Sequence, residues 1–332
     1  MSQKIDLNTS LIGQIEKELS GLPLPDTPNS LYDPFRYALK MGGKRVRPFM
    51  CLLANGLCGG NTDEAIPAAL AVEILHNFTL VHDDIMDRAD TRRGVESVFH
   101  KWDTNKAILS GDVMFSVSMQ QLNYYGSNEK FGKHDYAALN EVFLNAITTV
   151  CEGQALDMDF VDRQDVDHDE YLNMIAGKTG ALLGASLEMG AITAQAGSDT
   201  RKKLYSFGME LGLAFQIQDD LLDATADPEK FGKKLGGDIY EGKKTYLTIL
   251  ALERADGENK AFIQQVLDDN NPANDSVTKV LEMFHQLGVI KDISNEVDTH
   301  YEKAEEILND FSESPYKTEL NNLLLFLKNR DH

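Results

Sequence analysis

Apolar residues recur at helical spacing along almost the whole chain. In the segment 68–87, for example, Leu70, Ile74, Phe78 and Val81 repeat every three or four residues, which places their side chains on one face of an α-helix. Only nine of the 332 residues are proline, and no alternating Val- and Ile-rich run joined by an Asn-Gly or Asp-Gly turn predicts a hairpin. The sequence therefore predicts an all-α fold.

Helix-like segments follow one another from near the start of the chain to its end, separated by glycine- and asparagine-rich breaks. They are predicted over residues 10–21, 33–40, 68–87, 107–124, 137–159, 169–195, 201–224, 246–255, 259–270, 276–287, 291–311 and 314–329. No shift in composition marks a linker, so we expect one domain spanning residues 1–332. The longest irregular stretch, residues 227–244, is rich in glycine and lysine, which favours a functional loop over a linker.

The composition is that of an ordinary globular protein, with 42% hydrophobic and 26% charged residues. A net charge of -21 argues against nucleic acid or an anionic membrane as the main partner. The three cysteines, Cys51, Cys58 and Cys151, form no C-x-x-C pair, which suits a reducing cytoplasm. Without a visible signal peptide or an uncharged run near the ~20 residues of a membrane span, we expect a cytoplasmic protein with no stable membrane insertion.

Two acidic clusters share the spacing D-D-x-x-D. They are Asp83-Asp84-Ile-Met-Asp87 and Asp219-Asp220-Leu-Leu-Asp223. In a helix the first and fifth residues of each cluster lie one turn apart on one face. With 53 acidic residues in the chain, one such cluster is expected by chance about once, and a solvated acidic face is the alternative. Two copies made only of Asp, each followed by basic residues, favour Mg²⁺ held together with phosphate oxygens.

A compact basic cluster, Gly42-Gly43-Lys44-Arg45-Val46-Arg47-Pro48, stands out in so acidic a chain. Glycine and cations are typical of a helix C-terminus, but an arginine fork beside a lysine also suits a diphosphate. His76 lies seven residues before Asp83, on the same helical stripe; a lone helical histidine is more often a core residue. His82, directly before Asp83, leaves open a His-Asp dyad of a phosphohydrolase, although the other histidines show no matching pattern.

Two further patterns resemble known loops without matching them. Gly177-Lys178-Thr179-Gly180 has Leu172 where a phosphate-binding P-loop needs glycine, and it lies within a helical pattern. Its glycines instead permit a local break in the helix that directs Lys178 into a cavity. The acidic run that begins at Asp165 lacks the glycine and the final glutamate of a calcium-binding EF-hand. Gln154 and Asp157 place an amide and an acid on a helix that we expect to be buried.

Taken in order, the motifs resemble those of the trans-isoprenyl diphosphate synthases, the polyprenyl synthetase family. The resemblance covers nearly the whole chain, through GGKRVRP, LVHDDIMDRADTRRG, GKTG, FQIQDDLLD and FGKKLGGDIYEGKKT. It implies an isoprenoid synthase fold, a single helical domain around a deep central cavity, usually as a homodimer. It also implies condensation of isopentenyl diphosphate with allylic diphosphates (dimethylallyl, geranyl or farnesyl), assisted by three Mg²⁺ ions.

The resemblance also assigns expected roles to individual residues. Asp83, Asp87 and Asp219 would bind Mg²⁺, with Asp84, Asp220 and Asp223 in support and Asp157, beside Gln154, lining the reaction site near the metal. Arg92, Lys178, Lys233 and Lys243 would hold the allylic diphosphate, and Lys44, Arg47, His76 and Arg93 the isopentenyl diphosphate. Thr179 and Gln216 would stabilise the developing cation, and Phe215 would pack on the homoallylic substrate.

The chemistry explains why acids and cations suffice. Ionisation of the allylic C–O bond needs positive charge around the departing diphosphate. The double bond of isopentenyl diphosphate then attacks the allylic cation from a fixed position. The released diphosphate can remove the proton, so the reaction requires no general base from the protein.

The product length depends on what blocks the growing chain beside the first acidic cluster. Phe78 lies five residues before Asp83, about 7.5 Å along a helix. An aromatic residue there, followed by the small Thr79, resembles the geranylgeranyl-forming pattern, so we predict a C20 product, with C15 as the alternative. Met114, Phe115 or Met119 could instead form the floor.

Two other protein classes would share parts of this pattern. A terpene cyclase would normally carry an N-D-x-x-S-x-x-x-E site in place of the second Asp cluster. A non-catalytic regulatory subunit would be expected to lose one or both clusters, and both are intact here. The departures from the family pattern, Lys234 and the segment after Thr245, remove no charged ligand.

Overall fold

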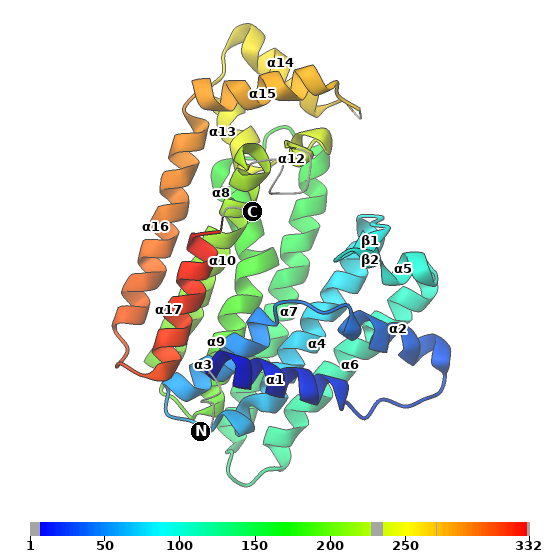
Figure 1. Cartoon of the computed structure of the whole chain (residues 1–332), viewed down its shortest axis with the longest axis vertical. Helices are drawn as coiled ribbons and strands as arrows, with labels where there is room; N and C mark the ends of the chain where they lie inside the picture. The colour runs from blue at the N-terminus through cyan, green and yellow to red at the C-terminus, as the bar shows by residue number, and fades with distance from the viewer. Residues whose placement is uncertain (1–6, 227–234, 270, 331–332) are drawn as a thin grey trace, which may run out of the picture. The chain divides into compact units, whose positions relative to one another are not determined.

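The computed structural model describes residues 7–226, 235–269 and 271–330. It divides into two compact units, which we describe separately (Figure 1). Unit 1 consists of Met1–Ile147, Ala185–Tyr205 and Phe311–Leu320, and unit 2 of Thr148–Gly184, Ser206–Asp310 and Asn321–His332. The described parts of both units are helical except for one small hairpin, which confirms the all-α prediction. The single domain expected over residues 1–332 stays a prediction.

Unit 1 is built mainly from the N-terminal helices. These are α1 (Leu7–Ser20), α2 (Asn29–Lys40), α3 (Val46–Leu57), α4 (Thr62–Met86), α5 (Val98–Lys101), α6 (Thr104–Ser127) and the first part of α7 (Lys133–Asp162). Parts of α9 (Ala181–Thr193), α10 (Ser198–Thr225) and α17 (Pro315–Lys328) complete it. Helix α4 packs against α3 and α6, and α1 contacts both α3 and α4; Figure 1 shows α4 and α6 side by side.

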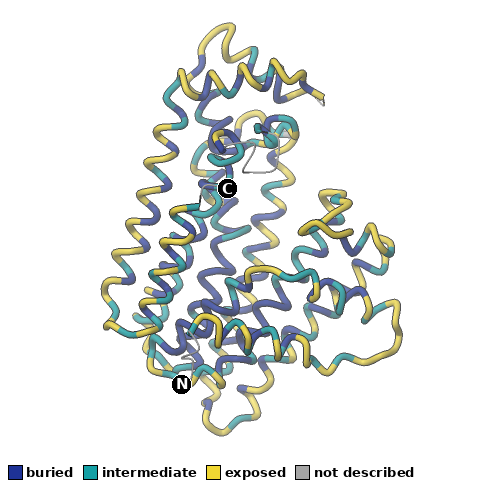
Figure 2. Tube along the Cα trace, in the orientation of Figure 1, coloured by how far each residue is buried: buried dark blue, intermediate teal, exposed yellow. Residues whose placement is uncertain are grey.

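Helix α4 forms the core of unit 1. Its apolar residues surround the whole helix instead of one stripe, which is the pattern of a buried helix, and Figure 2 shows it largely buried. It is the one helix in the described ranges that is long and apolar enough to cross a membrane, but 67% of that segment is already buried within the protein. Its buried polar residues are Glu73, Asn77 and Asp84, and each takes part in the polar contacts described below.

Unit 2 contains the remaining helices. They are α8 (His168–Ile175), the π-helical turn η1 (Ala176–Gly180), most of α10, α12 (Gly237–Tyr240), α13 (Tyr246–Arg254), α14 (Gly257–Leu267), α15 (Asn274–Gln286) and α16 (Val289–Asn309). Helix α16 buries Val289, Ile293 and Val297 along one face and packs on α13 and α15. The spacing of four residues explains this single buried stripe.

Helix α3, the β1–β2 hairpin and the short helices α5 and α12 were not predicted from the sequence. Helix α3 begins at Val46, within the basic cluster, and its Pro48 lies in the first turn, where a missing N–H is tolerated. A hairpin joins β1 (Thr91–Arg92) to β2 (Val95–Glu96), so the expectation of no hairpin was wrong. Its turn residues, Arg93 and Gly94, both have positive φ, 53° and 78°, the conformation of a tight hairpin turn that Asn-Gly more often supplies.

The expected break in the helical segment 169–195 is confirmed. Helix α8 ends at Ile175, and the π-helical turn η1 covers Ala176–Gly180 before α9 begins. A π-turn inserts an extra residue into the helical repeat, which changes the direction of the side chains that follow it. The turn contains Lys178, the residue for which the break was proposed, and also Thr179.

Candidate active site

The first acidic cluster lies at the C-terminal end of α4 in unit 1. The Asp87 N–H donates to the Asp83 carbonyl at 2.8 Å, so these two residues are one helical turn apart, as predicted. Asp84 is only 1% exposed, and Arg92 Nε donates to its Oδ1 at 2.7 Å. Burial raises the pKa of Asp84, and the Arg92 guanidinium opposes that shift. Arg92 therefore compensates the buried carboxylate, while Asp87 is exposed.

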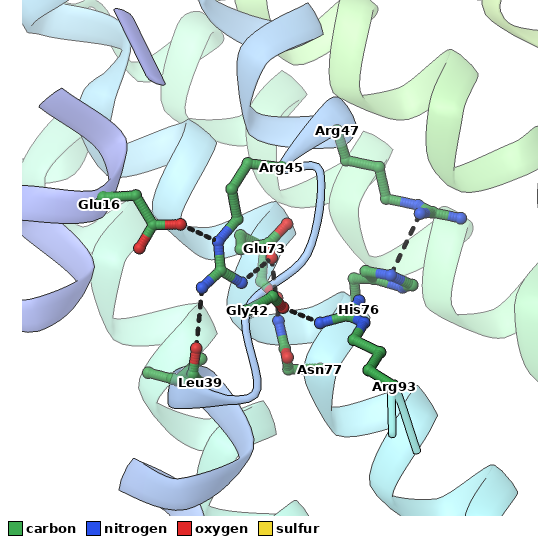
Figure 3. Close-up of polar contacts among 9 residues, drawn as sticks. All are labelled: Glu16, Leu39, Gly42, Arg45, Arg47, Glu73, His76, Asn77 and Arg93. Atoms are coloured by element: carbon green, nitrogen blue, oxygen red, sulfur yellow. Dashed lines mark hydrogen bonds and ion pairs between the residues drawn. The ribbon is translucent and has the colours of Figure 1, made fainter. Parts of the chain in front are cut away.

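Arg47, His76 and Arg93 form a second group in unit 1, here called the arginine cluster (Figure 3). Arg47 Nη1 lies 3.2 Å from His76 Nε2. Because a guanidinium can only donate, His76 Nε2 must accept, which leaves the ring proton on Nδ1. Burial and then the nearby Arg47 and Arg93 hold the pKa of His76 well below 6.5, so the ring is neutral at physiological pH.

The loop between α2 and α3 brings Arg93 to this cluster. The Arg93 guanidinium donates to the Gly42 carbonyl, and a Cβ added to Gly43 would lie 2.7 Å from Arg93 Nη1. Gly42 and Gly43 also have φ of 76° and 138°, which residues with a side chain rarely adopt. Both glycines are therefore needed for the hairpin arginine to pack against the loop. Lys44, the fourth predicted residue, follows on the same loop and is exposed.

The arginine cluster carries positive charge that its neighbours do not balance. Within the described ranges, neither Arg47 nor Arg93 forms an ion pair with a carboxylate. Burial, together with repulsion from Arg93, lowers the pKa of Arg47 to about 10, and Arg47 Nε is buried without a hydrogen-bond partner. An anion bound here would pair with both guanidinium groups.

The two alternatives for the chain-length floor are neighbours in unit 1. The rings of Phe78 and Phe115 lie 5.9 Å apart between centroids, and Phe115 stacks on Phe143 at 6.4 Å. Phe78 and Phe115 are therefore parts of one aromatic series that joins α4, α6 and α7. Thr79, next to Phe78, donates its hydroxyl to the His76 carbonyl at 2.8 Å.

His82 packs against α6. Its Nε2 lies 3.3 Å from the Ile108 carbonyl, and a Cβ on Gly111 would lie 2.2 Å from the same nitrogen. Gly111 therefore provides the space that the imidazole occupies. This contact gives His82 a packing role, and it does not support the His-Asp dyad of a phosphohydrolase.

In unit 2, close backbone packing positions Lys178. A Cβ on Gly153 of α7 would lie 2.3 Å from the Lys178 nitrogen, so only glycine allows α7 to approach η1 this closely. Lys178 Nζ forms an ion pair with Asp157 Oδ2, one turn further along α7. The structure therefore brings together two predicted site residues, and the glycine before Gln154 has a packing explanation.

A hydrogen-bonded chain leads from η1 to the second acidic cluster on α10. The Thr179 hydroxyl donates to Gln216 Oε1 at 3.2 Å, the Gln216 amide bonds to Asp220, and the Tyr171 hydroxyl donates to Asp220 Oδ2. A Cβ on Gly212 would lie 2.6 Å from the Gly180 Cα, which shows how closely α10 packs on η1. Burial, and then the charge of Asp238, raise the pKa of Asp220 to about 8.

The other two acids of the second cluster have different partners. Asp219 forms an ion pair with Arg330, whose guanidinium lies 4.4 Å from the centre of the Phe215 ring. Asp223 Oδ2 accepts the Asp238 N–H of α12 at 3.1 Å. Burial and the charge of Asp223 raise the pKa of Asp238 to about 6. The second cluster is thus fixed to both α12 and the end of the chain.

Lys243 lies near this cluster but is turned toward other acids. Its Nζ is 2.6 Å from Glu241 and 3.6 Å from Asp238. Burial opposes its charge, but the bond to Glu241 and the charge of Asp238 outweigh burial and raise its pKa. Lys233, the other lysine predicted to hold the allylic diphosphate, lies outside the described residues.

Several residues at these sites had no predicted role. They are Arg45, Glu73, Tyr171, Asp238 and Arg330. Glu73 had a usable signal, because it is the one acid in the apolar stretch from Ala65 to Leu75, three residues before His76. Asp238 lies in the Gly- and Lys-rich stretch already regarded as functional. Tyr171 and Arg330 are 49 and 111 positions away from the acids that they contact, and no local pattern indicates such pairs.

Comparison with known proteins gives a family match over most of the chain. Residues 28–284 match the polyprenyl synthetase family. A short chain isoprenyl diphosphate synthase of Methanocaldococcus jannaschii is 37% identical over 275 residues, covering 83% of this chain and 82% of that protein. A geranylgeranyl diphosphate synthase of Methanosarcina mazei is 35% identical over 312 residues, or 93% of each protein.

The fold is also found among solved structures. The crystal structure of geranylgeranyl pyrophosphate synthetase from Pyrococcus horikoshii Ot3 matches with a TM-score of 0.91 at 35% identity, covering 97% of both chains. This similarity confirms the isoprenoid synthase fold expected from the sequence motifs. From the family match, these relatives and the shared fold, the chain belongs to the polyprenyl synthetase family and is a short-chain trans-prenyltransferase.

Proposed function

We propose that this prenyltransferase condenses isopentenyl diphosphate with allylic diphosphates and releases geranylgeranyl diphosphate, a C20 product. The observation that carries the product length is the aromatic series Phe78–Phe115–Phe143. It begins five residues before Asp83, about 7.5 Å along α4. Bulky rings at this distance would stop a growing prenyl tail, and Thr79 would set the space beside them. The geranylgeranyl synthase of Methanosarcina mazei among the relatives supports the same length.

The arginine cluster is proposed to bind the diphosphate of the isopentenyl substrate. Arg47 and Arg93 supply two guanidinium groups without carboxylate partners, and Lys44 adds a third cation from the same loop. Neutral His76 can donate its Nδ1–H while Nε2 accepts from Arg47. Together these groups would hold the homoallylic double bond in a fixed position for attack on the allylic cation.

Magnesium is proposed at both acidic clusters, with three ions when substrate is bound. Among the described residues, no three His, Cys, Asp or Glu side chains converge as a ready-made metal site. The donor set fits Mg²⁺, which prefers oxygen ligands and shares its coordination with water and phosphate. Asp83, Asp87 and Asp219 would bind it, with Asp84, Asp220 and Asp223 in support. When bound, Mg²⁺ would neutralise the departing diphosphate and promote ionisation of the allylic C–O bond.

The remaining site residues have proposed roles around the allylic substrate. Lys178, Arg92, Lys243 and Lys233 would hold its diphosphate, and Asp157 would orient Lys178 through their ion pair. The Thr179 and Gln216 oxygens, joined by a hydrogen bond, would face the developing cation. Phe215 would pack on the homoallylic substrate. These contacts position charge and exclude water, and the released diphosphate would take the proton.

A homodimer and a cytoplasmic location are part of the same proposal. Large apolar side chains on α6, including Ile108 and Leu109, are exposed, which is favourable for contact with a second copy. No disulfide joins Cys51, Cys58 and Cys151, all of which lie in the described ranges, and this favours a reducing compartment. Size measurement in solution, with Leu109→Glu as the disrupting variant, tests the dimer.

The direct test is a product assay. The protein is incubated with isopentenyl diphosphate, Mg²⁺ and each of dimethylallyl, geranyl and farnesyl diphosphate, and the products are identified by mass spectrometry. We expect C20 from all three primers. A C15 or C25 end point would refute the proposed length, and failure to form a C–C bond with any primer would refute the substrates as well.

Substitution at the aromatic series tests the length determinant separately. Phe78→Ala should lengthen the main product by at least one C5 unit, because the tail can extend into the space that the ring occupied. Phe115→Ala should act in the same direction. Phe99→Ala on α5 is the matched control, since Phe99 has its ring contact with His100 instead. Unchanged products from both test variants would place the floor elsewhere.

A further inference from the structure

We propose that Arg45 is a positioning residue for the diphosphate-binding loop. Its buried contacts hold residues 42–47 in the conformation that presents Lys44 and Arg47 to the homoallylic diphosphate. This inference rests on the proposed role of those two residues. The sequence places three cations within four residues, but the structure separates them into two kinds, because Arg45 faces the protein interior.

The guanidinium of Arg45 joins three helices of unit 1. Arg45 is 4% exposed, and its Nη1 donates to Glu73 Oε1 of α4 at 2.7 Å. Its Nε donates to Glu16 Oε1 of α1 at 2.6 Å, and its Nη2 donates to the Leu39 carbonyl of α2 at 2.8 Å. Burial opposes the charge of Arg45, but the bonds to Glu16 and Glu73 outweigh it and raise the pKa.

The backbone at Arg45 explains why the loop needs these contacts. Arg45 precedes α3 with φ 49° and ψ 35°, the left-handed conformation, and no side chain caps the helix there. This conformation is unfavourable for a residue with a Cβ. The three hydrogen bonds of the guanidinium offset that cost and so fix the point at which α3 starts. Lys44 and Arg47 are placed on either side of this point.

Glu73 links the loop to the rest of the arginine cluster. Its Oε1 also accepts from Asn77 Nδ2 at 3.1 Å, which orients the carboxylate on α4, one turn before His76. Glu73 also acts to raise the pKa of both Arg47 and Arg93. Figure 3 shows Arg45 directed toward Glu16 and Leu39, and Arg47 directed toward His76.

The charges around Arg45 leave uncompensated positive charge for the diphosphate of the substrate. Figure 3 contains three arginines, Arg45, Arg47 and Arg93, and two glutamates, Glu16 and Glu73. Both glutamates form ion pairs with Arg45. The inner arginine is therefore satisfied by protein groups, and the two outer arginines keep their charge for the diphosphate. Loss of the Glu73 carboxylate would remove one of the bonds that hold Arg45 and would free the loop.

The first experiment compares three glutamate variants. Glu73→Gln should raise KM for isopentenyl diphosphate about tenfold, with kcat and KM for farnesyl diphosphate changed less than about twofold. Glu16→Gln should raise KM for isopentenyl diphosphate less. The Glu16 side chain is 45% exposed and borders a cavity of about 290 Å³, where water can replace the carboxylate. Glu18→Gln, on the same helix but paired with Lys17, is the matched control. Equal effects on both substrates would overturn the proposal.

The second experiment separates the backbone effect from a simple loss of packing. Arg45→Ala keeps a Cβ in the left-handed region and loses the guanidinium, whereas Arg45→Gly adopts that conformation freely. We expect KM for isopentenyl diphosphate to rise more in the alanine variant, by about tenfold over the glycine variant. A purely structural role predicts the reverse, because glycine removes more of the side chain. A glycine variant as impaired as alanine, or more, would overturn the proposal.

A binding measurement distinguishes failure of this inference from failure of the proposed substrates. Inorganic diphosphate is titrated into the wild-type protein and the Glu73→Gln variant by calorimetry in EDTA, so that metal-dependent binding does not contribute. Weaker binding to the variant, by about tenfold, supports the proposal even if the product assay fails. Equal binding to two folded proteins overturns it, whatever the product assay shows.

Discussion

The two acidic clusters have the same sequence pattern, but the buried acid at their second position is balanced in different ways. Asp84 is paired with the Arg92 guanidinium at 2.7 Å. Within the part of the chain that the structure describes, the hydrogen-bond partners of Asp220 carry no charge; they are the Tyr171 hydroxyl, the Gln216 amide and a backbone group. Burial raises the pKa of both acids, to about 8 for Asp220. In the first cluster the buried Asp84 is therefore compensated by an ion pair with Arg92. In the second cluster the buried Asp220 retains a proton near neutral pH.

The last acids of the clusters differ as well. Asp87 is the exposed residue at which α4 ends, whereas Asp223 lies within α10 and accepts the Asp238 N–H of α12 at 3.1 Å. The D-D-x-x-D spacing predicts where the carboxylates lie on a helix. It does not predict whether a carboxylate also stabilises the fold, because that depends on hydrogen-bond partners from other segments of the chain. Loss of the Asp87 carboxylate should therefore have little structural consequence, whereas loss of the Asp223 carboxylate removes a contact between α10 and α12.

The largest expected effect tests whether both clusters serve catalysis despite these differences. Asp87→Ala and Asp223→Ala should each lower kcat about a thousandfold, because each removes a carboxylate from a face that we propose to bind metal. Asp87→Ala should leave the melting temperature unchanged, and Asp223→Ala should lower it, because α12 loses a hydrogen bond. Steady-state assays and thermal unfolding measure the two effects. A stable, inactive Asp223→Ala protein would contradict the structural difference between the clusters.

Removing the partner of each buried acid, Arg92 for Asp84 and Tyr171 for Asp220, should show whether the two carboxyl groups differ in charge. Arg92→Met leaves the Asp84 carboxylate buried without compensation, and we expect the free energy of unfolding to fall by about 2–4 kcal/mol. Tyr171→Phe removes one hydrogen bond from an acid that is mostly protonated, which costs about 1 kcal/mol. Urea unfolding in EDTA at neutral pH measures both values. Equal losses would mean that the two buried acids carry the same charge.

The long helices and the positions of the carboxylates on them could be predicted from the sequence. Strong periodicity located α10 at residues 201–224, against Ser198–Thr225 in the structure. It did not locate α3, because the glycines, cations and Pro48 resemble the end of a helix as much as its start. The partners of the acids were not predictable either. Tyr171, Arg330 and Arg45 make contacts across folded helices, and their local sequences give no sign of these contacts.

The pH dependence of stability should differ between the clusters. Between pH 3.8 and about pH 8, the folded protein keeps a proton on Asp220 that the unfolded chain has released. The free energy of unfolding should therefore fall as pH rises through this range, relative to Asp220→Asn, by up to about 1.4 kcal/mol per pH unit.

The same comparison with Asp84→Asn should show a shallower slope. Burial raises the pKa of Asp84, but Arg92 acts against that shift, so fewer protons are retained on folding. Unfolding by urea from pH 5 to 9, without metal, measures both slopes. If the free energy of unfolding fell more steeply with pH for Asp84 than for Asp220, Asp84 would be the acid that retains its proton, and the assignment of charge would be reversed.

The smallest expected effect concerns Asp219, whose partner is Arg330. If Asp219 binds Mg²⁺ as proposed, the ion would compete with the Arg330 guanidinium for the same carboxylate, so Arg330→Gln should tighten Mg²⁺ binding in the presence of inorganic diphosphate. We expect about a threefold change, because an ion pair to a side chain that is 40% exposed contributes less than about 1 kcal/mol. Calorimetric titration measures it, with Lys328→Gln, which removes the ion pair to Asp298, as the control.

The direction of the Arg330 effect separates two kinds of cation at the clusters. Arg92 compensates a buried acid, and the metal binding proposed at Asp83 and Asp87 would not require it to leave. Arg330 is paired with Asp219, and an Mg²⁺ ion bound to that carboxylate would have to displace it. Weaker Mg²⁺ binding by Arg330→Gln would contradict this, because it would mean that the displaced guanidinium moves onto the diphosphate. In that case Arg330 would serve the second cluster as a cation for the diphosphate. The two clusters would then differ only in the partner of their buried acid, which is the Tyr171 hydroxyl for Asp220 and the Arg92 guanidinium for Asp84.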